Sequence, residues 1–153
     1  MGSTKAEWPF SEKEANDSTG FLIWQITTLW QRAIARQLKP YGLTQVQFVL
    51  LAGLLWLSGR EKHVTQVMLA QHSKLDVMMA SQVLRALESR GLLLRRSHPT
   101  DTRAKVLELT QAGRDVTVAT LPIVEGVDDV FFGEKGEGRK AFNRELLRLI
   151  TKV

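Results

Sequence analysis

The sequence predicts a mainly α-helical fold that carries one small β-hairpin, an α+β arrangement. Apolar residues recur at helical spacing through most of the 153 residues. The exception is a pair of short runs with strand character, Leu92–Arg96 and Arg103–Leu109, joined by the turn-rich segment Ser97–Thr102. The composition, with 44% hydrophobic and 24% charged residues, is that of a globular domain that buries its own core.

The N-terminal part divides into an arm and a helix. Residues 1–17 are polar and are expected to form a loosely held arm. A helical pattern begins at Ser18 and ends at Pro40, because proline removes a backbone donor and does not extend a helix. Residues Met1–Glu7 contain no hydrophobic stretch after their positive charge. We therefore expect no secretory signal there, and a cytoplasmic protein.

The second helix is expected at the centre of the core. Thr44 and Gln47 have the spacing of a capping box, which places the start of this helix at Gln45. The run Phe48–Leu57 is apolar on every side of the helix. Its ten residues are too few to cross a bilayer, so no membrane partner is expected. We expect the run to be buried, with Trp56 packed in the core.

Two short helices separated by a tight turn follow. Thr65 is a candidate N-cap for the first, Gln66–His72, and the Asp76 carboxylate is a candidate N-cap for the second. Gly91 is suited to the left-handed position that ends the second helix. The stripe expected to face the core consists of Ala80, Val83, Leu84 and Leu87. The opposite face consists of Met78, Ser81, Gln82 and Arg85.

Positive charge is concentrated in this middle part of the chain. The net charge of +5 divides into +2 for residues 1–60, +4 for residues 61–114 and −1 for residues 115–153. Between Arg85 and Lys105 there are six basic and two acidic side chains. Such a cluster indicates a surface for a polyanion, although an ordinary solvated surface is the alternative.

The order of these elements is that of a winged helix-turn-helix: a short helix, a turn, a helix with a polar outer face and then a basic hairpin. In this architecture the second helix presents side chains to the DNA major groove, where each base pair has a distinct pattern of donors and acceptors. The hairpin, or wing, reaches toward a neighbouring minor groove. We assign residues 44–113 to this DNA-binding domain.

From about Val64 to Gly113 the chain also resembles the MarR family of bacterial transcription regulators. The matching segments align with the family without gaps, at the expected separations: Leu69-Ala70, Leu75-Asp76, Leu87–Leu92, Asp101–Ala104 and Leu109–Gly113. The resemblance implies a triangular homodimer in which the first and last helices of both subunits interlock. It also implies repression of nearby genes and release by a small molecule, often an aromatic acid or a drug.

Apolar stripes outside residues 44–113 agree with a dimer. We assign residues 18–43 to the N-terminal helix of a dimerisation region and residues 114–153 to its C-terminal helices. A symmetric dimer would cover their apolar stripes, with packing inside one chain as the alternative. The stripe residues of the C-terminal helices are Val116, Ala119, Ile123, Val127, Val130, Phe131, Phe142, Leu146, Leu149, Ile150 and Val153. Two copies would read a pseudo-palindromic operator whose half-sites lie about one helical turn apart.

The candidate base-contacting residues of the recognition helix are Met78, Ser81, Gln82 and Arg85. The Gln82 amide can pair with adenine and the Arg85 guanidinium with guanine. Met78 is expected to face DNA, where thymine methyl groups are available to it. Met79 either faces DNA as well or fills the core. For the whole face, the alternative is solvent exposure without DNA contact.

On the wing, Arg103 is the principal candidate, because the resembling family inserts an arginine from this position. Asp101 is expected to structure the wing turn by bonding backbone and a nearby arginine, since a carboxylate beside phosphates is repelled. The other candidate wing contacts are Arg95, Arg96, His98, Thr102 and Lys105.

No catalytic residue, metal site or cofactor is expected. Without cysteine there is no disulfide, thiolate zinc site or cysteine nucleophile, nor the thiol-oxidation switch of the peroxide-sensing branch of the resembling family. The spacings of His63, His72 and His98 match no compact ligand motif. An enzyme would need a convergent acid–base pair, and the sequence shows none.

The predicted function is that of a regulator that binds double-stranded DNA sequence-specifically, as a repressor released by an aromatic or phenolic effector. A winged-helix module that docks a protein partner is the alternative. In the resembling family, effectors bind between the dimer helices and the winged domain. Trp24 is the candidate ligand contact, whereas Trp30 and Trp56 are expected to pack in the core.

Overall fold

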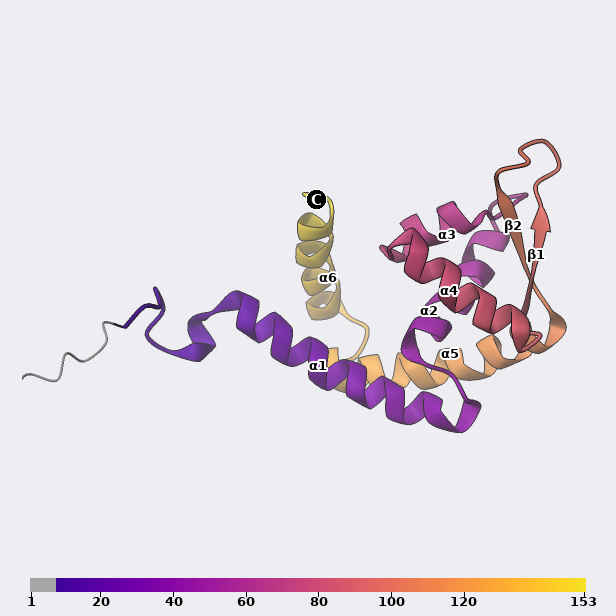
Figure 1. Ribbon diagram of the computed structural model, residues 1–153. Helices are drawn as coiled ribbons and strands as arrows, with labels where there is room; N and C mark the ends of the chain where they lie inside the picture. The colour runs from indigo at the N-terminus through magenta and orange to yellow at the C-terminus, as the bar shows by residue number, and fades with distance from the viewer. Residues whose placement is uncertain (1–7) are drawn as a thin grey trace, which may run out of the picture.

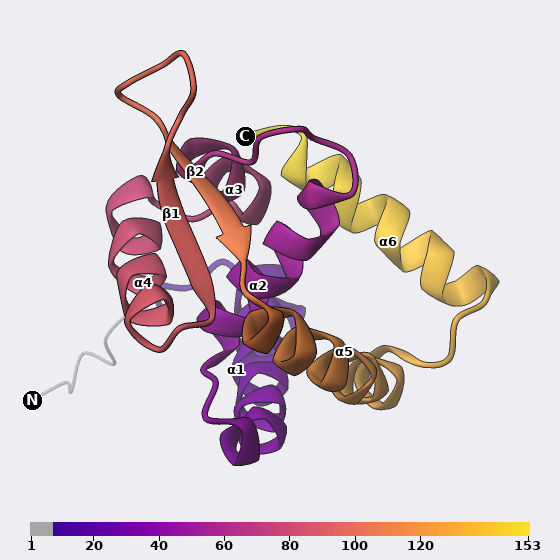
Figure 2. The ribbon, with the colours of Figure 1, turned by 90° about the vertical axis from the view of Figure 1, so that its right-hand side faces the viewer.

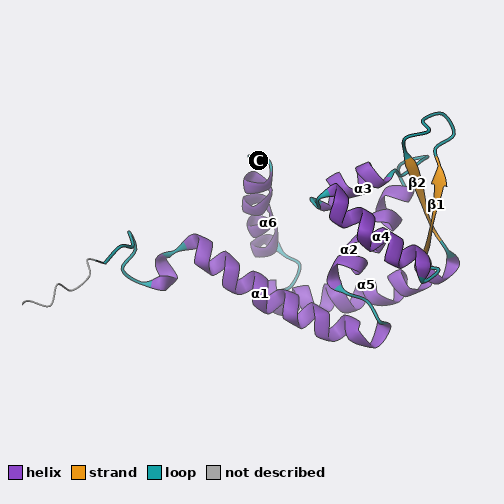
Figure 3. Ribbon diagram, in the orientation of Figure 1, coloured by secondary structure: helices purple, strands orange, loops and turns teal. Residues whose placement is uncertain are grey.

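The computed structural model describes residues 8–153 (Figures 1 and 3). The helices are α1 (Thr19–Leu38), α2 (Gln45–Ser58), α3 (Gln66–Ser73), α4 (Val77–Ser89), α5 (Gln111–Phe132) and α6 (Glu137–Ile150). The strands β1 (Leu93–Ser97) and β2 (Lys105–Leu109) form one antiparallel pair. This confirms the mainly α-helical class with a single hairpin. Residues 1–7 of the expected arm, where no secretory signal was expected, lie outside the described residues.

The described part of the arm is exposed and leads into α1. A short 3-10 turn covers Ala15–Asp17, and Ser18 then caps α1 by accepting a hydrogen bond from the Phe21 N–H at 3.3 Å. In Figure 1 the arm and the first turns of α1 extend away from the rest of the chain. A second 3-10 turn over Lys39–Tyr41 ends α1, and Gly42 turns the chain at a φ of 65°. The start of α1 and its end before Pro40 are therefore confirmed.

Helix α2 forms the centre of the core. The Thr44 and Gln47 capping box is present in both directions, with N···O distances of 3.1 and 3.2 Å. Around α2 pack residues from every other element of the winged domain and from α1 and α5. These are Ile34 and Leu38 of α1, Leu69 of α3, Leu84 and Leu87 of α4, Leu93 and Leu107 of the hairpin, and Val124 of α5. The expectation of a buried second helix is confirmed for Phe48, Leu50, Leu51 and Leu54.

Trp56 corrects the expectation that all of this run is core. Its side chain is 56% exposed, and the Arg60 guanidinium lies 3.7 Å from the ring centroid. Trp56 belongs to the last turn of α2, on a side of the helix that faces solvent, whereas the next residue, Leu57, packs against the core. A cation–π contact with a residue four positions later replaces core packing there.

The junction between the hairpin and α5 is held by a close backbone approach. Thr110 caps α5 by accepting from the Gly113 N–H at 3.0 Å, and its hydroxyl donates to the Gly91 carbonyl at 2.6 Å. Gly91 adopts the expected left-handed conformation, with a φ of 71°. A Cβ atom on Gly113 would lie 1.8 Å from the Leu92 carbonyl oxygen. Only glycine allows α5 to begin this close to the end of α4.

The face of α5 that packs against the rest of its own chain differs from the predicted apolar stripe. The buried residues are Gly113, Thr117, Thr120 and Val124, with Val116 and Val127 partly buried. Ala119 and Val130 of the predicted stripe are exposed. Threonine is tolerated inside because its hydroxyl donates within the helix, Thr117 to the Gly113 carbonyl at 2.6 Å and Thr120 to the Val116 carbonyl at 2.7 Å.

Helix α6 stands apart from the winged domain (Figures 1 and 2). None of its residues is buried, although it carries five large apolar side chains. These are Phe142, Leu146, Leu147, Leu149 and Ile150. Together with the exposed apolar side chains of α1, they form a surface that a single chain leaves open.

Within residues 8–153, no helix taken singly has the length and hydropathy to span a membrane. One pair of segments reaches this length and hydropathy when taken together, Thr19–Tyr41 with Gln45–Ser58, and the chain bends by 78° between them.

Candidate nucleic-acid interface

The helix-turn-helix is built by two side-chain caps and one left-handed residue. Thr65 accepts from the Met68 N–H at 3.2 Å at the start of α3. Lys74 turns the chain at a φ of 54°. Asp76 then caps α4, where one carboxylate oxygen accepts from the Met78 and Met79 N–H groups at 2.9 and 3.1 Å. The first turn of the recognition helix is therefore fixed by a charge-assisted cap.

Helix α4 separates a core face from an outer face as predicted. Ala80, Leu84 and Leu87 are fully buried, and Val83 is partly buried against the core. The outer face of α4 consists of Met78, Ser81, Gln82 and Arg85, of which Ser81 is half-buried and the others are exposed. Because residues three and four apart are neighbours on a helix, these four side chains form one continuous line. Met79 is 50% exposed, which excludes the reading that it fills the core.

The wing is the hairpin of β1 and β2 with its tip loop, residues 98–104. Leu93 pairs with Leu109 at its base and Ser97 with Lys105 at its far end. The Leu107 N–H donates to the Val64 carbonyl at 2.8 Å, which joins β2 to the segment before α3. Figure 2 shows the tip loop projecting beyond the helices, with α4 beside the hairpin.

The tip loop is folded by its own side chains. His98 Nδ1 accepts from the backbone N–H groups of Thr100 and Asp101 at 3.2 and 3.1 Å. Asp101 Oδ1 accepts from the Arg103 N–H at 3.0 Å, and the Ala104 N–H donates to the Asp101 carbonyl. Within residues 8–153 no ion pair joins Asp101 to an arginine side chain. The carboxylate is thus used for the turn, and the Arg103 side chain is exposed.

The basic residues of the interface differ in how far their charge is already neutralised. Arg95 donates to Glu88 at 2.8 Å with its side chain 21% exposed, and Arg96 donates to Glu108 at 3.1 Å on the surface. In the described part of the chain, the exposed basic residues Arg85, Arg103 and Lys105 form no ion pair. Thr102 is exposed between them. The unneutralised cations lie on α4 and at the far end of the wing.

Arg90, counted with the basic cluster in the sequence, has a structural role. Its Nη1 donates to the Gly42 carbonyl at 2.7 Å and to Gln47 Oε1 at 3.3 Å. These bonds join the end of α4 to the start of α2. The guanidinium therefore helps to hold α4 in place against the start of α2 and is not part of the outer face of α4.

Two further features belong to this interface. Val77 is 44% exposed, so three consecutive apolar residues, from Val77 to Met79, face solvent at the start of α4. The run of apolar residues directly after the Asp76 cap was the available signal for it. The second feature is His63, whose ring lies edge-on to that of His98 with 5.3 Å between centroids. These histidines are 35 positions apart, and no local pattern connects them.

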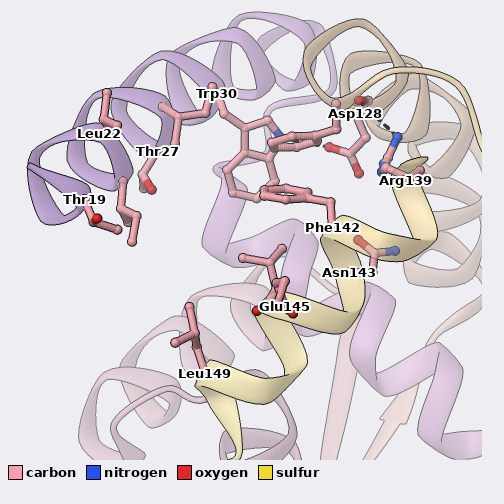
Figure 4. A pocket seen from close by; sticks show the side chains of 14 residues that line it. Thr19, Leu22, Thr27, Trp30, Asp128, Arg139, Phe142, Asn143, Glu145 and Leu149 are labelled. Atoms are coloured by element: carbon pink, nitrogen blue, oxygen red, sulfur yellow. Dashed lines mark hydrogen bonds between the residues drawn. The ribbon is translucent and has the colours of Figure 1, made fainter. Parts of the chain in front are cut away.

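An apolar pocket lies outside this interface, between α1, the end of α5 and α6 (Figure 4). Its volume is about 710 Å³. Trp30 lines it, with Nε1 donating to Asp128 Oδ1 at 2.7 Å, so Trp30 is only partly a core residue. Phe132 lies between the Trp30 and Phe142 rings, at centroid distances of 6.1 and 5.9 Å. Trp24, 70% exposed, is not among the lining residues.

Comparison with known proteins agrees with this geometry. Residues 39–128 match the model of the ArnR1-like winged-helix domain family. YdcH of Bacillus subtilis (strain 168), named an uncharacterized HTH-type transcriptional regulator, is 42% identical over 126 residues, which are 82% of this chain and 86% of YdcH.

Solved structures share the fold over most of the chain. BpsR of Bordetella bronchiseptica, in a structure that describes regulation of its DNA binding by 6-hydroxynicotinic acid, has a TM-score of 0.78 and 21% identity over 93% of this chain and 99% of BpsR. A MarR variant from E. coli in complex with operator DNA has a TM-score of 0.73 and 22% identity over 86% of this chain and 91% of MarR. These relatives are transcriptional regulators and not enzymes. The chain is a winged-helix transcriptional regulator that belongs to the ArnR1-like winged-helix domain family, and it shares the fold of the MarR regulators.

Proposed function

We propose that this regulator is a homodimeric repressor that binds a pseudo-palindromic operator and releases it when a small aromatic acid binds. The outer face of α4 enters the major groove of each half-site, and the wing reaches the adjacent minor groove. The observation that carries this proposal is the exposed amide of Gln82 on α4 together with three exposed cations, Arg85, Arg103 and Lys105, that form no ion pair within residues 8–153. The amide can pair with a base edge, and the guanidinium groups can bind base edges or phosphates.

The open apolar surface of α1 and α6 supports the dimer. Leu22, Ile23 and Ile26 of α1 line the same pocket as Phe142 and Leu146 of α6. All five are at least 37% exposed in one chain. A second copy covers such a surface with its own equivalent helices, because the same patch serves both subunits of a two-fold dimer. The dimer then presents two copies of α4 to successive turns of DNA.

An aromatic effector is supported by one structural neighbour, BpsR, whose DNA binding is regulated by 6-hydroxynicotinic acid. Trp24 remains the proposed contact, since its exposed indole lies on α1 within the dimerisation region. A titration of indole fluorescence with 6-hydroxynicotinic acid and related aromatic acids, repeated on Trp24→Phe, tests this point. No change in operator affinity with any of these acids would contradict the effector.

The experiment that tests DNA recognition is selection from a duplex library with a randomised core, followed by titration of the selected duplex and a scrambled duplex. We expect tighter binding to the selected duplex. We also expect log K to fall linearly with log salt, by about 0.9 for each neutralised phosphate. Weak binding without salt dependence would instead favour a module that docks a protein partner.

A further inference from the structure

Three consecutive apolar side chains occupy the first turn of the recognition helix and do not pack against the core. Val77, Met78 and Met79 are 44%, 72% and 50% exposed, and none of them is among the residues packed against the core. We call these three residues the apolar patch of α4. Exposed apolar runs of this length are disfavoured in a folded protein unless they have a function.

The patch is held in a defined position. The Asp76 carboxylate bonds the N–H groups of Met78 and Met79, so the backbone that carries the patch is fixed. Met78 lies one turn before Gln82 and two turns before Arg85 on the same side of the helix. The patch is thus continuous with the outer face of α4, at the end of the helix whose residues contact base edges in helix-turn-helix complexes.

Only one group on the major-groove edge of ordinary base pairs is apolar, and it is the C5-methyl of thymine. A cytosine methylated at C5 offers the same group. The Asp76 carboxylate beside the patch uses one of its two oxygens, Oδ1, for both capping bonds. Thioether side chains are flexible and polarizable, and they adapt to the position of a methyl group.

We propose that the apolar patch of α4 reads C5-methyl groups of thymine in the operator, with Met78 as its central contact. This inference rests on the proposed function, because it requires α4 to lie in the major groove. It adds the chemical class of the base that is read. Each half-site then carries thymine beside the position that Gln82 contacts.

The test uses the duplex selected from the randomised library, prepared in two forms that differ only in deoxythymidine or deoxyuridine within the core. Replacing thymine by uracil removes the methyl group and keeps every donor and acceptor. We expect about a fourfold loss of affinity for each contacted methyl group, the effect of exposing one methyl-sized apolar group. We expect the ratio of the two affinities to approach one in Met78→Ala, with weaker single effects in Val77→Ala and Met79→Ala.

Arg103→Ala serves as the matched control. It lowers affinity for both duplexes by the same factor and leaves their ratio unchanged, because the wing lies outside the groove that carries the methyl groups. A further pair of duplexes carries cytosine or 5-methylcytosine at a thymine position of the selected core, which separates the methyl group from the rest of the thymine base. Tighter binding to the 5-methylcytosine duplex than to the cytosine duplex also supports the patch.

The inference and the proposed function fail in different ways. If the wild-type protein binds the selected duplex but does not distinguish thymine from uracil, the inference is overturned and the proposed function stands. The same holds if it distinguishes them and none of the three alanine variants lowers the ratio. If the protein binds no duplex, both are overturned. Thermal unfolding of the variants establishes that the helix is intact.

Discussion

Arg95 Nε lies 2.8 Å from Glu88 Oε2, and this ion pair joins the last part of α4 to the first strand of the wing. The Arg95 side chain is 21% exposed and the Glu88 side chain 35%, so the pair is shielded more than the surface pairs of α6. The two elements that we propose to contact DNA are therefore also fixed to one another by side chains. Arg95 is placed to orient the wing rather than to neutralise a phosphate.

Arg95→Ala is accordingly expected to weaken operator binding several-fold without changing the slope of log K against log salt. The guanidinium is paired with Glu88 and does not neutralise a phosphate. Its removal therefore leaves the number of counterions released from DNA on binding unchanged. The expected loss of folding stability is about 1 kcal/mol, because the pair is only partly buried. Binding titrations at several salt concentrations measure the slope. A slope reduced by about one would make Arg95 a phosphate contact.

Arg103→Ala and Lys105→Ala are expected to behave differently. Each removes an exposed cation that has no ion pair in the described structure, and each should weaken binding to all duplexes and lower the salt slope by about 0.9. Arg32→Ala is the control with the same charge change, because Arg32 belongs to α1, a helix that lies away from the wing tip in Figure 1. An equal loss of slope in the control would show that net charge, not wing contact, is responsible.

Gln82→Ala should change sequence preference more than it changes affinity for scrambled DNA. A bidentate amide–adenine pair contributes about 1–3 kcal/mol of discrimination against the wrong base. Selection with the variant and competition between single-base variants of the operator measure this effect. An identical selected sequence for variant and wild type would remove Gln82 from base recognition.

Gly113→Ala tests the junction between hairpin and α5. The added methyl group would lie 1.8 Å from the Leu92 carbonyl oxygen, so the backbone has to move and we expect a loss of about 3 kcal/mol of folding stability. Gly126→Ala, in the same helix with open space at Cβ, is expected to be neutral or slightly stabilising. Urea unfolding of both variants measures the difference. Equal effects would contradict the close approach.

Leu146→Glu tests the apolar surface of α6. A carboxylate placed in a covered interface is strongly unfavourable, so the variant should dissociate to monomers and lose operator binding. Arg144→Glu introduces the same side chain at an exposed position of the same helix and is expected to remain dimeric. Light scattering after gel filtration gives the mass. A Leu146→Glu variant that remains dimeric would place the interface elsewhere.

Local chemistry made much of the fold predictable. The predicted caps at Thr44, Thr65 and Asp76 each depend on residues three or fewer positions apart, and all three are present. The same holds for the left-handed Gly91, because a single residue type suits that conformation. The two faces of α4 followed from helical spacing. The strands begin at Leu93 and Lys105, each later than predicted, since strand ends depend on the partner strand.

Relationships between distant residues were not predictable in the same way. Helix α5 carries two apolar sides, and only packing against α1 and α2 decides that Thr117 and Thr120 face inward while Val130 stays exposed. Tertiary packing also decides that Leu57 contacts the core while Trp56 stays exposed, and the pairing of Arg95 with Glu88 depends on how the hairpin folds back beside α4.

The sequence by itself thus determined the order of the elements, their caps and the family, because these depend on neighbours along the chain. The tertiary structure alone decided which charges remain free for a polyanion and which apolar faces remain uncovered. Those outcomes depend on which distant segments meet, and burial and charge pairing are properties of such contacts rather than of residues.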